Sequence, residues 1–243
     1  KYNEISSSKG LFEIQPLDKG LGVTLGNSFR RVLLSSMSGA GLVGLKIKGV
    51  PHEFSTLTNV NEDVLEIICN LKEIIFKKDA PGLEVLTLKV SAKKTVTAED
   101  IKTPSGVHIL NPKQFLFQVT GKADVDIELH VDSGVGFRDS KLKTRDNEDE
   151  DVFFIHIDTS FSPIVKVNHT VDSIRVGKEL DHDKLVIEVE TNGTVKPDDA
   201  IKEKATVTYV SNGVLKNATI PVKHKKKLGK IKSLHVQKQY LSK

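Results

Sequence analysis

Three glycines and an arginine pair form the densest group of potentially functional residues in this 243-residue chain. Gly20, Gly22 and Gly26 follow an apolar stretch, and Arg30 and Arg31 come one helical turn later. Glycines between a strand and a helix are typical of loops whose backbone amides bind phosphate, and guanidinium groups bind planar anions well. The G-x-G-x-x-x-G spacing therefore supports one chemical hypothesis: an enzyme that binds a nucleotide cofactor such as NADP through the loop from Gly20 to Gly26.

Other reactive residue types give no catalytic or metal-binding pattern. The eight histidines lack H-x-x-x-H spacing, and Cys69 is the only cysteine. No serine stands in a G-x-S-x-G context. A dinucleotide fold would also need repeated β-α-β units, whereas this chain contains predominantly strands. We therefore expect no catalytic residue, no metal and no cofactor, and keep NADP binding as an alternative.

The end of the chain offers a second alternative. Residues 202–243 contain eleven lysines and one acidic residue, Glu203, so their net charge is +10 in a chain of net charge +4. The segment Lys223–Lys232 is basic enough to hold phosphates nonspecifically through counterion release, but it has no aromatic residue for stacking on bases. The two interpretations are a solvated basic tail and a basic nucleic-acid-binding protein.

The arginine pair belongs to a predicted helix with two different sides. The residues that recur with helical spacing are Leu25, Phe29, Val32, Leu33 and Ser36. They predict a helix of about twelve residues, preceded by a turn at Gly20 and Gly22. Leu34 falls outside this stripe, and both arginines lie beside it. Guanidinium groups contribute nothing to a core, so this combination indicates a docking surface.

A second helix is predicted after residue 60. Asn61 is the expected N-cap, and the carboxylates of Glu62 and Asp63 suit the first turn. The apolar stripe consists of Val64, Ile68, Leu71 and Ile75. Lys77 and Lys78 are expected at the far end of this helix, and Cys69 in core or semi-buried space on it.

Most of the remaining chain alternates as short strands between turns. The expected strands are 42–50, 83–90, 95–101, 107–110, 114–120, 124–131, 152–158, 164–176 and 184–190. Asp181, His182 and Asp183 are expected to form a turn, and Pro197 to begin a helix. Asn212-Gly213 predicts a hairpin between strands at 205–210 and 214–220. The polar segment 138–151 is expected to be a solvated loop. No apolar run approaches the ~20 residues of a membrane span, so we expect no membrane partner.

Five blocks of this sequence resemble the amino-terminal region of the bacterial-type RNA polymerase alpha subunit. They are FEIQPLDKGLGVTLGNSFRRVLLSSMSG (12–39), GVPHEFSTLTNVNEDVLEIICNLK (49–72), VTAEDI (96–101), SPI (162–164) and LVIEVETNGTVKPDDAI (185–201). They stand in the family's order and extend over residues 11–203, and the L-G-N-x-x-R-R-[IV]-L-L-S-S pattern is close to diagnostic.

The resemblance implies an α+β protein of two domains. A dimerisation and assembly domain would combine residues 1–38 and 163–222, and a mainly antiparallel β domain, 39–162, would be inserted between them. Residues 223–243 would form a basic tail. It also implies a non-catalytic scaffold subunit of DNA-directed RNA polymerase, which forms a homodimer, docks the two large catalytic subunits and meets DNA indirectly through the complex.

The resemblance assigns roles to the first helix. Asn27, Arg30, Arg31 and Leu34 would face the large subunits, and Leu25, Phe29, Val32 and Leu33 would face the core and the dimer seam. The implied compartment is the bacterial cytoplasm, with plastids as the alternative. The sequence departs from the family at Val135, where an arginine is usual. It departs again after Lys204, where β-branched residues replace a long helix of the dimer seam.

Overall fold

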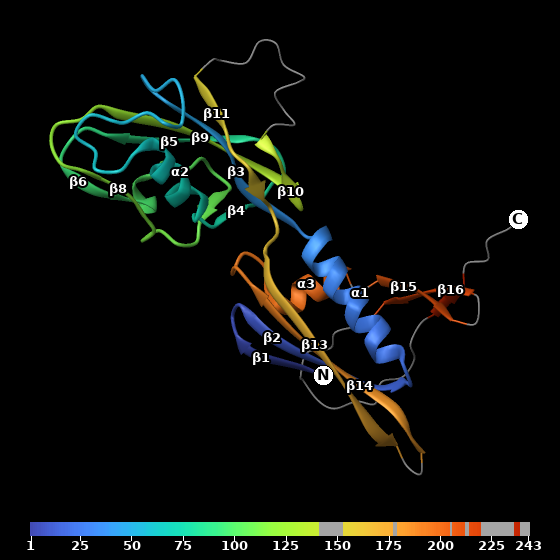
Figure 1. Cartoon of the computed structure of the whole chain (residues 1–243). Coiled ribbons are helices and arrows are strands. Elements are labelled where there is room, and N and C mark those ends of the chain that lie inside the picture. The colour runs from blue at the N-terminus through green and yellow to red at the C-terminus, as the bar shows by residue number, and fades with distance from the viewer. Residues whose placement is uncertain (141–152, 177–178, 205, 212–213, 220–235, 239–243) are drawn as a thin grey trace, which may run out of the picture. The chain divides into compact units, whose positions relative to one another are not determined.

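A few helices and many antiparallel strands make up this protein, as the computed structural model in Figure 1 shows for residues 1–140, 153–176, 179–204, 206–211, 214–219 and 236–238. The helices are α1 (Leu21–Ser36), α2 (Val64–Lys72) and α3 (Pro197–Lys204), with a 3₁₀ turn at Ala98–Asp100. The strands before residue 100 are β1 (Tyr2–Ser6), β2 (Lys9–Asp18), β3 (Ser38–Ile47), β4 (Phe76–Lys78), β5 (Glu84–Val90) and β6 (Lys94–Thr97). Those between 100 and 162 are β7 (Val107–Ile109), β8 (Phe115–Val119), β9 (Val125–Val135), β10 (Phe137–Arg138), β11 (Phe154–His156) and β12 (Thr159–Ser160). The rest are β13 (Ile164–Val176), β14 (Glu179–Thr191), β15 (Thr206–Ser211), β16 (Val214–Thr219) and β17 (Val236–Lys238). This composition confirms the α+β class.

The chain divides into two compact units. The terminal unit consists of Lys1–Met37 and Pro163–Lys243, and the central unit consists of Ser38–Ser162. Each unit has its own cluster of buried apolar side chains.

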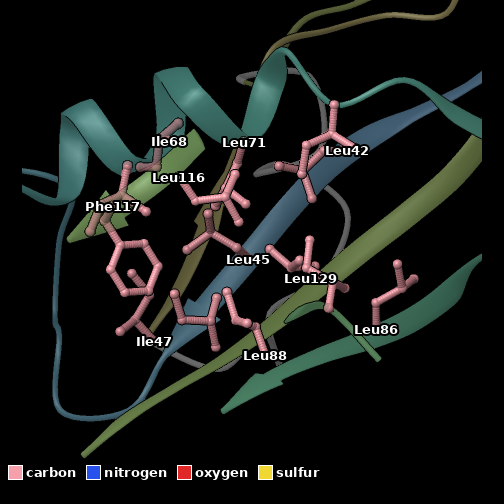
Figure 2. Packing of buried hydrophobic residues seen from close by; sticks show 14 of the residues in the cluster. Leu42, Leu45, Ile47, Ile68, Leu71, Leu86, Leu88, Leu116, Phe117 and Leu129 are labelled. Carbon is pink, nitrogen blue, oxygen red and sulfur yellow. The ribbon is translucent and has the colours of Figure 1, made fainter. Parts of the chain in front are cut away.

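The central unit is built on an antiparallel sheet with the strand order β11-β3-β9-β5. Side chains alternate between the two faces of a strand, so one face of β9 buries every second residue. These residues are Val125, Ile127, Leu129 and Val131. Figure 2 shows Leu45, Leu88 and Leu129 of the sheet together with Ile68 and Leu71 of α2 in one cluster. Helix α2 therefore covers the apolar face of this sheet.

Helix α2 differs from its prediction at both ends. Asp63, rather than Asn61, is the N-cap, and its Oδ1 accepts a hydrogen bond of 2.7 Å from the Glu66 amide. The Asn61 side chain instead donates to Gln118 Oε1 at 3.1 Å. The helix ends at Lys72, so the expected continuation through Ile75 to Lys77 and Lys78 is wrong, and both lysines lie in β4. Cys69 is exposed, contrary to expectation.

The terminal unit is built on an antiparallel sheet with the strand order β1-β2-β14-β13. One face of this sheet packs against α1, and its buried residues on β14 include Asp183, Leu185, Ile187 and Val189. The other face carries ion pairs, among them Lys9 with Glu188 and Lys184 with Glu13. The hydrogen bond from Lys9 lowers the pKa of Glu188. Because one face is apolar and the other charged, the sheet must present its apolar face to α1.

Three sequence predictions for the terminal unit have clear outcomes. The expected turn at Asp181, His182 and Asp183 is wrong, because all three residues lie within β14. The helix that begins at Pro197 is confirmed, and so is the pairing of β15 with β16 in a hairpin register from Ser211 with Val214 onward. The expected turn residues, 212–213, lie outside the described residues. So do most of the loop predicted at 138–151 and the basic segment Lys223–Lys232.

No helix in the described ranges has the length and apolarity needed to cross a membrane.

Candidate functional site

Helix α1 separates its side chains into a buried side and an exposed side. It is longer than predicted, with sixteen residues, and it includes Gly22 and Gly26. The sequence predicts that Gly22 lies in the turn before the helix. In the structure Gly22 is helical, and Gly20, with φ of 82°, is the residue that precedes the first turn. Apolar contacts with the sheet therefore begin one turn earlier than the apolar stripe alone predicts.

The buried side of α1 rests on the sheet of the terminal unit. Leu25, Phe29 and Leu33 are buried there, and Val32 is half-buried at the margin. Their neighbours in the cluster include Val167 of β13 and Leu185 and Ile187 of β14. These contacts fix the helix to the sheet through an apolar seam.

The exposed side of α1 carries the residues that the sequence singled out for docking. Asn27, Arg30, Arg31 and Leu34 are all exposed. With about 3.6 residues per turn, positions i, i+4, i+7 and i+11 share a stripe. On α1 this stripe consists of Val23, Asn27, Arg30 and Leu34. Val23 is 52% exposed and Leu34 is 38% exposed, so the stripe combines apolar groups at both ends with polar groups between them.

The charge on this surface is unbalanced. Helix α1 contains no aspartate or glutamate, and neither Arg30 nor Arg31 forms an ion pair with any residue that the structure describes. The nearby hydroxyl groups are directed to the backbone, since Ser28 donates to the Thr24 carbonyl at 2.8 Å and Ser35 to the Arg31 carbonyl at 2.7 Å. The two guanidinium groups are therefore the charged feature of this surface.

A carboxylate from β14 holds the start of α1. Asp183 Oδ2 accepts hydrogen bonds from the Gly20 amide at 2.8 Å and from the Gly22 amide at 3.1 Å. Asp183 is not among the functional residues expected from the sequence, where it was predicted to lie in a turn. The only signal that could have found it is the period-two continuation of Leu185 and Ile187 back to Asp183.

The glycines of α1 allow the helix to lie close to the sheet. A side chain at Gly22 would place its Cβ 2.7 Å from Cγ1 of Val171, and a Cβ at Gly26 would overlap the ring of His169. Val171 and His169 both belong to β13. The glycine spacing thus serves the contact between helix and sheet.

This geometry does not fit a nucleotide cofactor. The amides of Gly20 and Gly22, which would hold a phosphate, already bind the Asp183 carboxylate. Strand β2, which precedes the glycines, pairs in an antiparallel sheet, so there is no parallel β-α-β crossover at this point. The NADP alternative therefore has no support at this loop.

The other candidate chemistries also lack a site in the described part of the chain. No group of three or more His, Cys, Asp or Glu side chains is placed to hold a metal ion there. A shallow hollow on the central sheet is lined by Lys46, Lys48, Asp126, Glu128 and Phe153, among others, and its charges of opposite sign balance. The exposed side of α1 is the best-supported candidate surface.

Comparison with known proteins first gives a match within the central unit. Residues 45–162 match the family model of the RNA polymerase Rpb3/RpoA insert domain. This match lies within the central unit, Ser38–Ser162.

Similarity to RNA polymerase alpha subunits extends the comparison to both units. The chain is 43% identical over 202 residues to the DNA-directed RNA polymerase subunit alpha of Syntrophomonas wolfei, which covers 83% of this chain and 64% of that protein. It is 42% identical over 202 residues to the subunit alpha of Lawsonia intracellularis, covering 83% of this chain and 58% of that protein. It is 38% identical over 198 residues to the subunit alpha of Synechococcus, covering 82% of this chain and 59% of that protein. The chain thus spans about three fifths of the length of these curated relatives, and its resemblance to the bacterial-type RNA polymerase alpha subunit is confirmed.

Proposed function

We propose that this protein is a non-catalytic scaffold subunit of a multisubunit DNA-directed RNA polymerase. It forms a homodimer and docks the two large catalytic subunits for transcription. The names of the similar proteins support the complex, since each is an RNA polymerase alpha subunit. The exposed side of α1 supports the docking role.

One observation carries the docking proposal: two guanidinium groups without an ion pair among the described residues stand on a helix that has no acidic residue. Arginine next to apolar groups is typical of residues that dominate interface energies. Asn27, Arg30, Arg31 and Leu34 would contact the large subunits, and those subunits would supply carboxylates for the arginines and an apolar recess for Leu34.

The dimer is proposed to form through the terminal unit. Its assembly domain would comprise residues 1–38 and 163–222, with residues 39–162 as the inserted domain and 223–243 as the tail. Leu25, Phe29 and Leu33 are buried against their own sheet, so their contribution to a seam is to hold α1 rigid. Val32, which is half-buried, is the apolar residue of this group with surface left for a second copy.

The test is Arg31→Ala in the full chain, combined with capture of the two large subunits. Arg31 is exposed and has no ion pair among the described residues, so its removal should leave folding and dimerisation unchanged. We expect capture to weaken about tenfold or more, since a central interface arginine contributes roughly 1–2 kcal/mol or more. Light scattering measures the dimer, and a titrated pull-down measures the capture.

The matched control is Lys93→Ala, which removes an exposed cation from the central unit and should not change capture. Undiminished capture by Arg31→Ala would exclude this arginine from the docking surface. A strictly monomeric chain that binds NADP would exclude the scaffold function itself.

A further inference from the structure

We propose that Asp183 is the positioning residue that sets the docking surface of α1 in place. The inference rests on the proposed function, because it gives Asp183 a role in binding the large subunits without contact to them. Its basis is that a single carboxylate oxygen on β14 accepts hydrogen bonds from the first amides of a helix that lies more than 160 residues earlier in the sequence.

Helix α1 has no cap of its own. Its N-cap residue is Gly20, in the left-handed conformation with φ of 82° and ψ of −12°, and it makes no side-chain capping bond. The first turn contains no acidic residue. The first amides of a helix need acceptors, and the positive end of the helix dipole favours a negative charge. Asp183, which lies outside the helix, provides both the hydrogen-bond acceptor and the negative charge.

The sheet holds Asp183 in a fixed place. In β14 it pairs with Leu17 of β2 on one side and with Ser173 of β13 on the other. Its side chain is buried, with 6% of the residue exposed, and it forms no ion pair with a described lysine or arginine. A buried carboxylate needs compensation, and the two amides at the helix end supply it. Neither partner of this contact is therefore free to move without leaving a buried charge or unpaired amides.

The contact determines where the arginines stand. Gly22 touches Val171 and the Asp183 side chain itself, and one turn later Gly26 lies on the ring of His169. Two consecutive turns of α1 thus lie directly against side chains of the sheet, with no room for a side chain at either glycine. Because a helix is rigid over such a length, its position and rotation here fix the directions of Arg30 and Arg31 in the following turn.

The experiment compares Asp183→Ala, Asp183→Asn and the control Asp172→Ala in the full chain. Asp172 is an exposed aspartate on β13 of the same sheet. Hydrogen exchange of the Gly20 and Gly22 amides, measured by NMR, reports the cap directly. Capture of the two large subunits shows whether the arginines of α1 are correctly positioned for docking.

We expect Asp183→Ala to accelerate exchange of these two amides by about tenfold to a hundredfold, as for the loss of a hydrogen bond to a charged group. Capture should weaken by about tenfold while the chain remains folded and dimeric. Asparagine keeps an oxygen acceptor in nearly the same place, so Asp183→Asn should restore most of the protection and most of the capture. Asp172→Ala should change neither.

The possible outcomes separate this inference from the proposed function. Unchanged amide exchange in Asp183→Ala would overturn the cap. Faster exchange with unchanged capture would overturn the positioning role, and the docking proposal would stand if Arg31→Ala still weakens capture. If Asp183→Ala does not fold, Asp183→Asn decides: amide protection and capture that change together, whether both are retained or both fall, support positioning, whereas lost protection with full capture, or full protection with lost capture, contradicts it. Full capture by both Asp183→Ala and Arg31→Ala would count against the docking surface as a whole.

Discussion

Arg138 stabilises the charged form of Asp132 in the central unit, at the point where β9 ends. Arg138 Nη1 lies 2.7 Å from Asp132 Oδ2 and its guanidinium group stands 4.8 Å from the centre of the Phe161 ring. Burial raises the pKa of Asp132, but the hydrogen bonds from Arg138 and from the Ser133 amide outweigh it, so the net pKa lies below its usual value. The pair therefore favours the ionised carboxylate in the folded protein.

This pKa shift predicts a pH-dependent stability. A carboxylate whose pKa is lower in the folded protein stabilises it above the unfolded pKa of about 3.9, and this contribution disappears as the pH falls through the folded pKa. Asp132→Asn should therefore cost stability at pH 6 and progressively less toward pH 3. Urea unfolding of both proteins at several pH values measures this, and a difference that stays constant with pH would contradict it.

The exposure and contacts of individual residues were the least predictable from the sequence. Cys69 follows the apolar residues of α2, but it falls between the buried positions Ile68 and Leu71, and the sheet covers only one side of the helix. Asp183 was missed because local composition favours a turn there. Its strand conformation depends on pairing with Leu17, which is far away in the sequence. Arg31 was found because its exposure follows from helical spacing alone.

At the scale of elements, α2 shows how a helix start is selected among neighbouring polar residues. Asn61 and Asp63 are both good N-cap residues. The Asn61 backbone amide donates to the carbonyl of Gln118 at 3.1 Å, and this contact, fifty-seven residues apart, keeps residue 61 outside the helix. Asp63 then takes the cap position.

We expect Asp63→Ala to lower the free energy of unfolding of the central unit by about 1 kcal/mol, because the Glu66 amide loses its acceptor. The matched variant Asn61→Ala, which leaves the cap intact, should cost less. Urea unfolding measures both values. A larger loss for Asn61→Ala than for Asp63→Ala would show that the cap does not limit the stability of this helix.

Elements with strong periodicity were predictable. The strand 164–176 and the helix start at Pro197 agree with the structure, since alternation and a proline followed by acids are local signals. Helix α1 was predicted too short, because Gly22 is unfavourable in an isolated helix and was placed in the preceding turn, whereas Gly26 lay within the predicted helix. Contacts with Val171 and His169 compensate for them, and those contacts are absent from the local sequence.

At the scale of the whole molecule, the two buried clusters have no residue in common. Leu33 belongs to the cluster of the terminal unit and Leu129 to that of the central unit, and both are fully buried. A substitution in one core is therefore expected to lower the stability of that unit and to leave the other unit unchanged.

Leu33→Ala should lower the free energy of unfolding of the terminal unit by about 2–5 kcal/mol, and Leu129→Ala should lower that of the central unit by a similar amount. We expect calorimetry of the full chain to show two transitions, with each substitution lowering only one of them. A single transition that both substitutions lower equally would mean that the two units unfold as one cooperative body.

The pairing of β2 with β14 has a consequence for the order of events during synthesis. Residues of the central unit are contiguous, so the ribosome delivers all of them before β13 and β14 exist. Helix α1 is made early, yet the strand that carries Asp183, Leu185 and Ile187 is made late. A nascent chain therefore holds the apolar side of α1 uncovered until synthesis passes residue 191. Under the proposed function, only a chain that extends past β14 presents a seated arginine pair, so products that stop before β14 should not capture partners.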